Sequence, residues 1–155
     1  MGMTKLQIMD WIEGFLKDDD WKYRQLEGKM ILKMGVNLKC KMKSTDLFID
    51  VKDDEYLVYA ISPLKGDPES LGEILRYISL VNYGMKNGNF ELDVEDGEIR
   101  YKTYVNLDGA TEIPTQVLKD SIYIPVMMMD KYGNGIAALS MGFSDADTEY
   151  QNARS

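Results

Sequence analysis

The stretch "KMILKMGVNLKCKMK", residues 29–43, alternates between apolar and polar side chains. One parity holds Met30, Leu32, Met34, Val36, Leu38, Cys40 and Met42, and the other holds Lys29, Lys33, Asn37, Lys39, Lys41 and Lys43. Because successive side chains of a β-strand point to opposite faces, the pattern predicts a sheet with one buried face and one face in water. The run is long for one strand, and Gly35 is the residue where a bulge, bend or turn is expected.

Helical spacing precedes this stretch and further strands follow it. Thr4 is a candidate N-cap, and apolar residues recur at helical spacing over residues 6–16. Residues 45–62 alternate again on both sides of Asp53-Asp54, which predicts two strands. On the second of them the apolar parity is assigned to Leu57, Tyr59 and Ile61.

Two more helices are predicted in the second half of the chain. One opens at Asp67-Pro68 and ends near Gly88, with an apolar stripe at i, i+3, i+4 spacing. The other begins near Pro114, is kinked at Pro125 and is interrupted at Gly133 and Gly135. The fold class is therefore α+β: a helix, a three-stranded antiparallel sheet, a helix, a β-hairpin and a C-terminal helix. We expect one domain over residues 1–143 and a disordered polar tail over 144–155.

Composition removes several classes of function. The 155-residue chain has no histidine and a single cysteine, so a disulfide within the chain, a Cys/His zinc site and a histidine-based triad are excluded. Cys40 lies on the apolar parity and is expected to be buried and not a nucleophile. The net charge of −8 disfavours nucleic acid as a partner. No run of residues is long enough to span a membrane and no signal peptide is recognised, so a cytoplasmic location is expected, with no cofactor and no metal.

The segment "GNFELDVEDGEIRYKTYVNLDG", residues 88–109, is the most acidic part of the chain that has regular patterning. An EF-hand loop started at Asp93 fails, because Gly97 falls at the fifth position and Tyr104 at the twelfth. Alternation instead predicts a hairpin whose two-residue turn is Asp96-Gly97. Its acids, Glu91, Asp93 and Glu95, then share the wet face, where Asp93 or Glu95 would pair with Arg100 or Lys102 of the return strand.

This hairpin also carries a family resemblance. The asparagine-bearing helix that runs into "G-x-F-E-x-D-x-x-D-G-E-x-R-Y", and the later "MD-x-Y" of Met129, Asp130 and Tyr132, resemble the YbjN family. The first motif is matched by Gly88, Phe90, Glu91, Asp93, Asp96, Gly97, Glu98, Arg100 and Tyr101. The resemblance implies a type III secretion chaperone-like fold, a role as a sensory transduction regulator, and relatives that are homodimeric chaperones of extended protein segments. It brings no catalytic residues.

We therefore expect a non-enzymatic, homodimeric regulator that binds a protein or peptide. Two groups of residues are candidates for the partner site: Met127, Met128 and Met129, and the lysines Lys39, Lys41 and Lys43. Methionines suit adaptable interfaces but equally fill cores, and the lysines equally form a solvated face. A small-ligand sensor is the alternative function. An enzyme that uses carboxylates or its ten tyrosines would need a deep pocket with converging acids.

Overall fold

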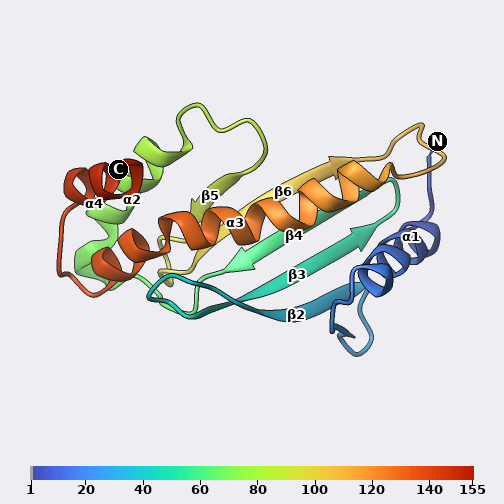
Figure 1. Cartoon of the computed structure of the whole chain (residues 1–155), viewed down its shortest axis with the longest axis horizontal. Helices are drawn as coiled ribbons and strands as arrows, with labels where there is room; N and C mark the ends of the chain where they lie inside the picture. Colours follow the sequence, from blue (N-terminus) through green and yellow to red (C-terminus); the bar gives the residue numbers. More distant parts are fainter. Residues whose placement is uncertain (1) are drawn as a thin grey trace.

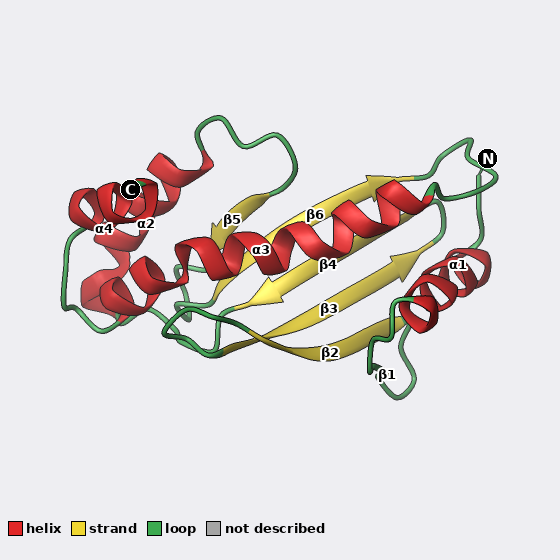
Figure 2. Cartoon of the chain, in the orientation of Figure 1, coloured by secondary structure: helices red, strands yellow, loops and turns green. Residues whose placement is uncertain are grey.

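The computed structural model describes residues 2–155 and shows a single six-stranded antiparallel sheet with four α-helices (Figures 1 and 2). The strands are ordered β1-β2-β3-β4-β6-β5, so β1 and β5 form the two edges. The α+β class predicted from the sequence is confirmed. In chain order the elements are α1 (Lys5–Asp18), β1 (Arg24–Gln25), β2 (Ile31–Asn37), β3 (Ser44–Lys52), β4 (Glu55–Ile61), the short 3₁₀ turn η1 (Pro68–Ser70), α2 (Leu71–Asn82), β5 (Asn89–Leu92), β6 (Ile99–Asn106), α3 (Thr115–Ser140) and α4 (Ala146–Arg154).

All the α-helices that contact the sheet lie on one of its faces. α3 runs along β6, β4 and β3, and α1 packs beside it on β3 and β4 (Figure 1). The strand register puts the buried side chains on that same face, with Leu32 opposite Ile49 and Ile49 opposite Val58. The core is therefore one apolar layer between helices and sheet, and no helix of residues 2–155 covers the second face of the sheet.

The start of α1 forms as the sequence predicts. Thr4 is the N-cap: its hydroxyl accepts a hydrogen bond from the Gln7 amide at 3.2 Å, and the Gln7 side chain accepts one from the Thr4 amide at 2.9 Å. This reciprocal capping box satisfies two amide groups that a helix start otherwise leaves without a partner. Among residues 2–155, no helix is both long enough and apolar enough to cross a bilayer.

The long strand predicted over residues 30–43 is shorter than expected. β2 ends at Asn37, and residues 38–43 form a loop in which the Lys43 amide bonds the Cys40 carbonyl and Lys43 itself adopts a φ of 72°. Gly35 is an ordinary strand residue that pairs with Asp46. The alternation continues past the strand because the loop buries Cys40 and Met42 and exposes Lys39, Lys41 and Lys43.

The hairpin exists, but its turn is longer than predicted. Leu92 pairs with Ile99, and the Asp93 amide bonds the Glu98 carbonyl, so residues 94–97 form a four-residue loop and not a two-residue Asp96-Gly97 turn. Gly97 does take a positive φ of 81°, and its carbonyl accepts a hydrogen bond from the Gly66 amide. The glycine is required by this close approach as well as by its backbone angle.

α3 is one continuous helix through Pro125, Gly133 and Gly135, whereas the sequence predicted an interruption at the two glycines. Both glycines allow close packing. A Cβ on Gly133 would collide with the Cys40 thiol, and one on Gly135 would collide with the Tyr77 hydroxyl. They are therefore the places where the 38–43 loop and α2 approach the helix.

The tail over residues 144–155 was predicted to be disordered, and this is wrong. Asp145 caps α4 by accepting the Thr148 amide, and Ala146 is fully buried. The helix contacts α2 and α3 (Figure 1). Arg76 of α2 forms a bidentate pair with Asp147 at 2.9 and 3.1 Å. Only a narrow side of α4 is buried, so its sequence lacks the apolar stripe that identified the other helices.

Candidate functional site

The uncovered face of the sheet is apolar at its centre. β4 buries Tyr56, Val58 and Ala60 against the helices, whereas the sequence assigned the buried parity to Leu57, Tyr59 and Ile61. Those three residues instead lie half-buried on the face without helices, where Tyr59 pairs with Phe48 of β3. We call Phe48, Leu57, Tyr59 and Ile61 the open-face apolar cluster. The sequence prediction failed because both parities of this strand are apolar.

Cations stand over the aromatic rings of this cluster. The Arg100 guanidinium lies 4.3 Å from the centre of the Tyr59 ring, and the Lys33 ammonium lies 5.6 Å from that of Phe48. Such stacking holds the long side chains along the sheet and adds a favourable cation–π attraction.

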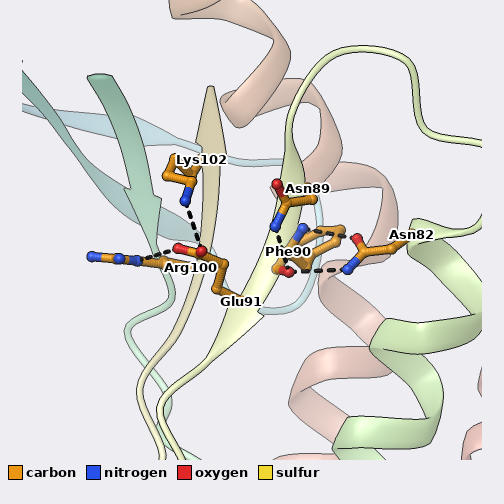
Figure 3. Close-up of polar contacts among 6 residues, drawn as sticks. All are labelled: Asn82, Asn89, Phe90, Glu91, Arg100 and Lys102. Carbon is orange, nitrogen blue, oxygen red and sulfur yellow. Dashed lines mark hydrogen bonds and ion pairs between the residues drawn. The ribbon is translucent and has the colours of Figure 1, made fainter. Parts of the chain in front are cut away.

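Glu91 holds Arg100, the cation that stacks on Tyr59 of the cluster, and also binds Lys102. Its two carboxylate oxygens accept hydrogen bonds from Arg100 Nε and Lys102 Nζ, each at 2.8 Å, and Figure 3 shows the carboxylate placed between the two cations. Burial alone would raise the pKa of Glu91, but the hydrogen bonds from Lys102 and Arg100 outweigh it and hold that pKa below its usual value. The expected pairs with Asp93 or Glu95 are replaced by Glu91, because Glu91 is the residue directly opposite Arg100.

Asn82 clamps the strand that carries Glu91. Its side-chain oxygen accepts the Phe90 amide at 2.8 Å, and its side-chain nitrogen donates to the Phe90 carbonyl at 3.0 Å (Figure 3). The last residue of α2 thus satisfies both backbone groups of one residue on the edge strand β5. The Phe90 ring packs edge-on against Tyr101 and Tyr132 on the core side.

The structure brings together part of the residues predicted as a partner site. Lys39, Met127 and Met128 line one hollow of about 500 Å³ beside α3. Lys41 and Lys43 are exposed on the same loop but do not line this hollow. Met129 is fully buried in the core, which excludes it as a contact for a partner.

Asp130, of the "MD-x-Y" motif, holds the loop that carries those lysines. Its Oδ1 accepts the amides of Lys39 and Cys40 at 2.9 and 2.8 Å, and Asn134 accepts the amide of Lys41 at 2.8 Å. Cys40 is 8% exposed, and burial raises the pKa of its thiol, as expected for a packed residue and not for a nucleophile. Sequence reasoning missed this role because the partners lie about 90 residues apart.

The acidic and tyrosine side chains whose pKa values are shifted lie in hydrogen bonds, ion pairs or the core. Within residues 2–155 no three Cys, Asp or Glu side chains are grouped so that they could hold a metal ion. The shifted carboxylate pKa values, those of Asp19, Glu91 and Asp145, all move downward and not toward the raised values of a general acid. Burial raises the pKa of Tyr56 and Tyr101 to about 12, and both side chains belong to the core.

Comparison with known proteins finds a matching family and solved structures of similar fold. Residues 9–137 match the YbjN family, which is described as "Putative bacterial sensory transduction regulator". The chain also resembles a solved structure, "Crystal structure of YbjN, a putative transcription regulator from E. coli", with a TM-score of 0.61 and 13% sequence identity, over 81% of this chain and 90% of that one. No curated protein matches the chain. The structural match supports the fold, and the chaperone-like comparison stays a prediction.

Proposed function

We propose that this chain, which belongs to the YbjN family, is a non-enzymatic regulator that acts by binding protein. The family description supports a regulatory role, and the carboxylates and tyrosines described above serve ion pairs and packing. We keep the cytoplasm as its proposed location. The holding of extended segments, as in type III secretion chaperones, remains a prediction from the resemblance.

One observation carries the proposal: β4 is apolar on both of its faces, but helices cover only one of them. Strands that read as continuous apolar runs are typical of sheets buried on both sides, whereas a strand with one wet face normally alternates. Leu57, Tyr59 and Ile61 occupy three of the four positions of β4 on the uncovered face, beside Phe48, and Glu55 occupies the fourth. A contiguous apolar area of this kind is typical of an interaction surface.

We propose a second copy of the chain as the occupant of this face. The whole chain carries −8, so two copies repel each other on average. The outward positions of β2 to β6, in contrast, balance four cations against four carboxylates, and Arg24 of β1 adds one further cation. These residues are Lys33, Lys52, Arg100 and Lys102 against Asp46, Asp50, Glu55 and Glu91. A nearly neutral face with both signs around an apolar centre can complement itself across a two-fold axis.

The test is the mass of the chain in solution, measured by light scattering over a range of concentrations. Leu57→Thr, Tyr59→Thr and Ile61→Thr are combined in one variant, because threonine keeps a high strand propensity while it removes the apolar area. Tyr83→Thr is the matched control: Tyr83 follows α2 and its side chain is 93% exposed. We expect a dimer for the parent and the control, and a monomer for the triple variant.

Two results would overturn the homodimer. A parent chain that stays monomeric at high concentration leaves the face to a different protein, and a triple variant that stays dimeric places the interface elsewhere. Circular dichroism and a urea unfolding curve establish that the triple variant is folded, so that a loss of the dimer is attributed to the surface.

A further inference from the structure

A second surface lies on the helical side of the molecule, in a hollow between α1 and the beginning of α3. Its volume is about 580 Å³, within the usual range for ligand pockets. Trp11 and Phe15 of α1 and Leu118 of α3 provide apolar lining, and Trp11 is 40% exposed although it is a large aromatic residue. Three carboxylates, of Asp10, Asp18 and Asp19, also line the hollow.

Gly14 lines this hollow and has no side chain to fill it. It lies in the middle of α1, where glycine is the least favourable residue apart from proline. A Cβ added at Gly14 would meet nothing within 4 Å, so no close packing inside the chain requires the glycine. The two glycines within α3 differ, because each of them accommodates a neighbouring side chain. The missing side chain of Gly14 leaves room in the hollow itself.

The charge around the hollow is negative. Among the described residues no lysine or arginine lines it, and Lys119 is a neighbouring cation that acts on Asp19. The Tyr123 hydroxyl and the Trp21 indole, at 2.9 Å, donate hydrogen bonds to Asp19 and lower its pKa, with the Tyr123 bond contributing most. The hollow therefore presents apolar walls beside three aspartate side chains.

We propose that this hollow binds an amphipathic helical segment of a partner protein, with apolar side chains over Gly14 and lysine or arginine against Asp10, Asp18 and Asp19. This rests on the proposed protein-binding function and names the chemistry of the partner. A helix laid along a groove between two helices is a common mode of peptide recognition. Oppositely charged rims select the partner and speed its association.

The chain's own lysine loop is a poor occupant for this hollow. Lys39, Cys40 and Lys41 are tied through their amides to Asp130 and Asn134, far along α3 from Leu118. At a rise of about 1.5 Å per residue, Asp130 and Asn134 lie roughly 20 Å along the helix from Leu118. A second copy that placed its loop in this hollow would be detected as self-association, with a mass that grows with concentration.

The test uses a fluorescently labelled synthetic amphipathic helix of leucine and lysine as the probe, and the same helix with glutamate in place of lysine as its counterpart. Binding is followed by fluorescence anisotropy. A second reading comes from the intrinsic fluorescence of Trp11 in a Trp21→Phe background, since Trp11 and Trp21 are the two tryptophans of the chain. We expect the lysine helix to bind, to shift the Trp11 emission to the blue and to weaken with added salt, and the glutamate helix not to bind.

Gly14→Met and Gly72→Met form the decisive pair of variants. Both positions are helical glycines with open space at Cβ, and methionine raises helix propensity at each, so neither variant is expected to unfold the chain. Filling the hollow at Gly14 should weaken binding of the lysine helix by about tenfold or more, whereas Gly72→Met should bind as the parent does.

Equal affinity of the two methionine variants would overturn the proposal, because the peptide would then bind the acidic surface in general. Absence of binding by the parent would overturn it as well. Neither result affects the mass measurement on the sheet-face variant, so failure of this site is distinguished from failure of the protein-binding surface proposed above.

Discussion

Replacement of Asn82 by alanine tests how the β5 edge is held. Both polar atoms of the Asn82 side chain form hydrogen bonds with the backbone of Phe90. The side-chain oxygen accepts from the Phe90 amide at 2.8 Å, and the side-chain nitrogen donates to the Phe90 carbonyl at 3.0 Å. Alanine removes both bonds and keeps the helix. The change therefore isolates the clamp between α2 and the edge strand, without altering the apolar core beneath Phe90.

The expected loss follows from the two bonds and the helix. A net contribution of about 1 kcal/mol for each hydrogen bond gives a loss of roughly 2 kcal/mol. Alanine at the end of α2 returns about 0.5 kcal/mol through its higher helix propensity. The free energy of unfolding should fall by about 1.5 kcal/mol, which corresponds to a fall in Tm of roughly 3–6 °C for a domain of this size.

Urea unfolding, fitted with a common slope for all variants, measures this loss. Asn87→Ala is the matched control, because Asn87 is exposed and takes part through its backbone carbonyl, which accepts the Tyr101 hydroxyl. The control should stay within about 0.5 kcal/mol of the parent. If Asn82→Ala lost no more stability than Asn87→Ala, water would be replacing the clamp and the reasoning would be refuted.

Three further results are expected. The pKa of Glu91 is lowered in the folded state, so the stability that its ionised form contributes is present above the unfolded pKa of about 4.3 and is lost as the pH falls through the lower folded pKa. In urea titrations Glu91→Gln should therefore be less stable than the parent at pH 7 and equal to it well below pH 4. A difference in unfolding free energy that persists at low pH would contradict this. Gly97 and Gly109 have φ of 81° and 80°, but of these two only Gly97 has a backbone carbonyl with which a Cβ would collide. Gly109→Ala should lower the free energy of unfolding by about 1 kcal/mol, and Gly97→Ala should lower it clearly more. Equal losses would show that the close approach of Gly66 to Gly97 is unimportant. Asp130→Ala should release the loop and raise the rate of Cys40 labelling by a thiol reagent several-fold, and an unchanged rate would show that packing alone holds it.

Local patterns predicted those parts of the fold that local physics determines. The capped helix at Thr4, the period-two strands and the stripe of α2 each follow from side-chain spacing within one segment. The hairpin was found for the same reason. Its loop length was not, because the close approach of Gly66 to Gly97 joins segments that are about 30 residues apart.

The candidate sites could not be predicted in the same way. For β4 the sequence offers two apolar parities, and only the placement of the helices decides which one is buried. The three methionines are consecutive, and the rotation of α3 alone buries Met129 while Met127 remains 56% exposed. Gly14 carries no signal in the sequence, because an open hollow beside it becomes visible only when α3 is in place.

Some of the residues that resemble the family have a structural task and lie away from the two surfaces proposed to bind partners. Gly88, at a φ of 82°, leaves no space for a Cβ beside the Lys102 carbonyl, and Asp130 holds the 38–43 loop through backbone amides. Such residues position other parts of the chain and need not touch a partner. The open-face apolar cluster lies outside the 88–132 motif region, and so does the lining of the hollow at Gly14 apart from Thr115 and Leu118 of α3. Most motif residues therefore identify the scaffold, whereas the apolar centre of the open face and most of the hollow consist of residues outside the motif, and substitutions on these two surfaces should change binding while the fold is retained.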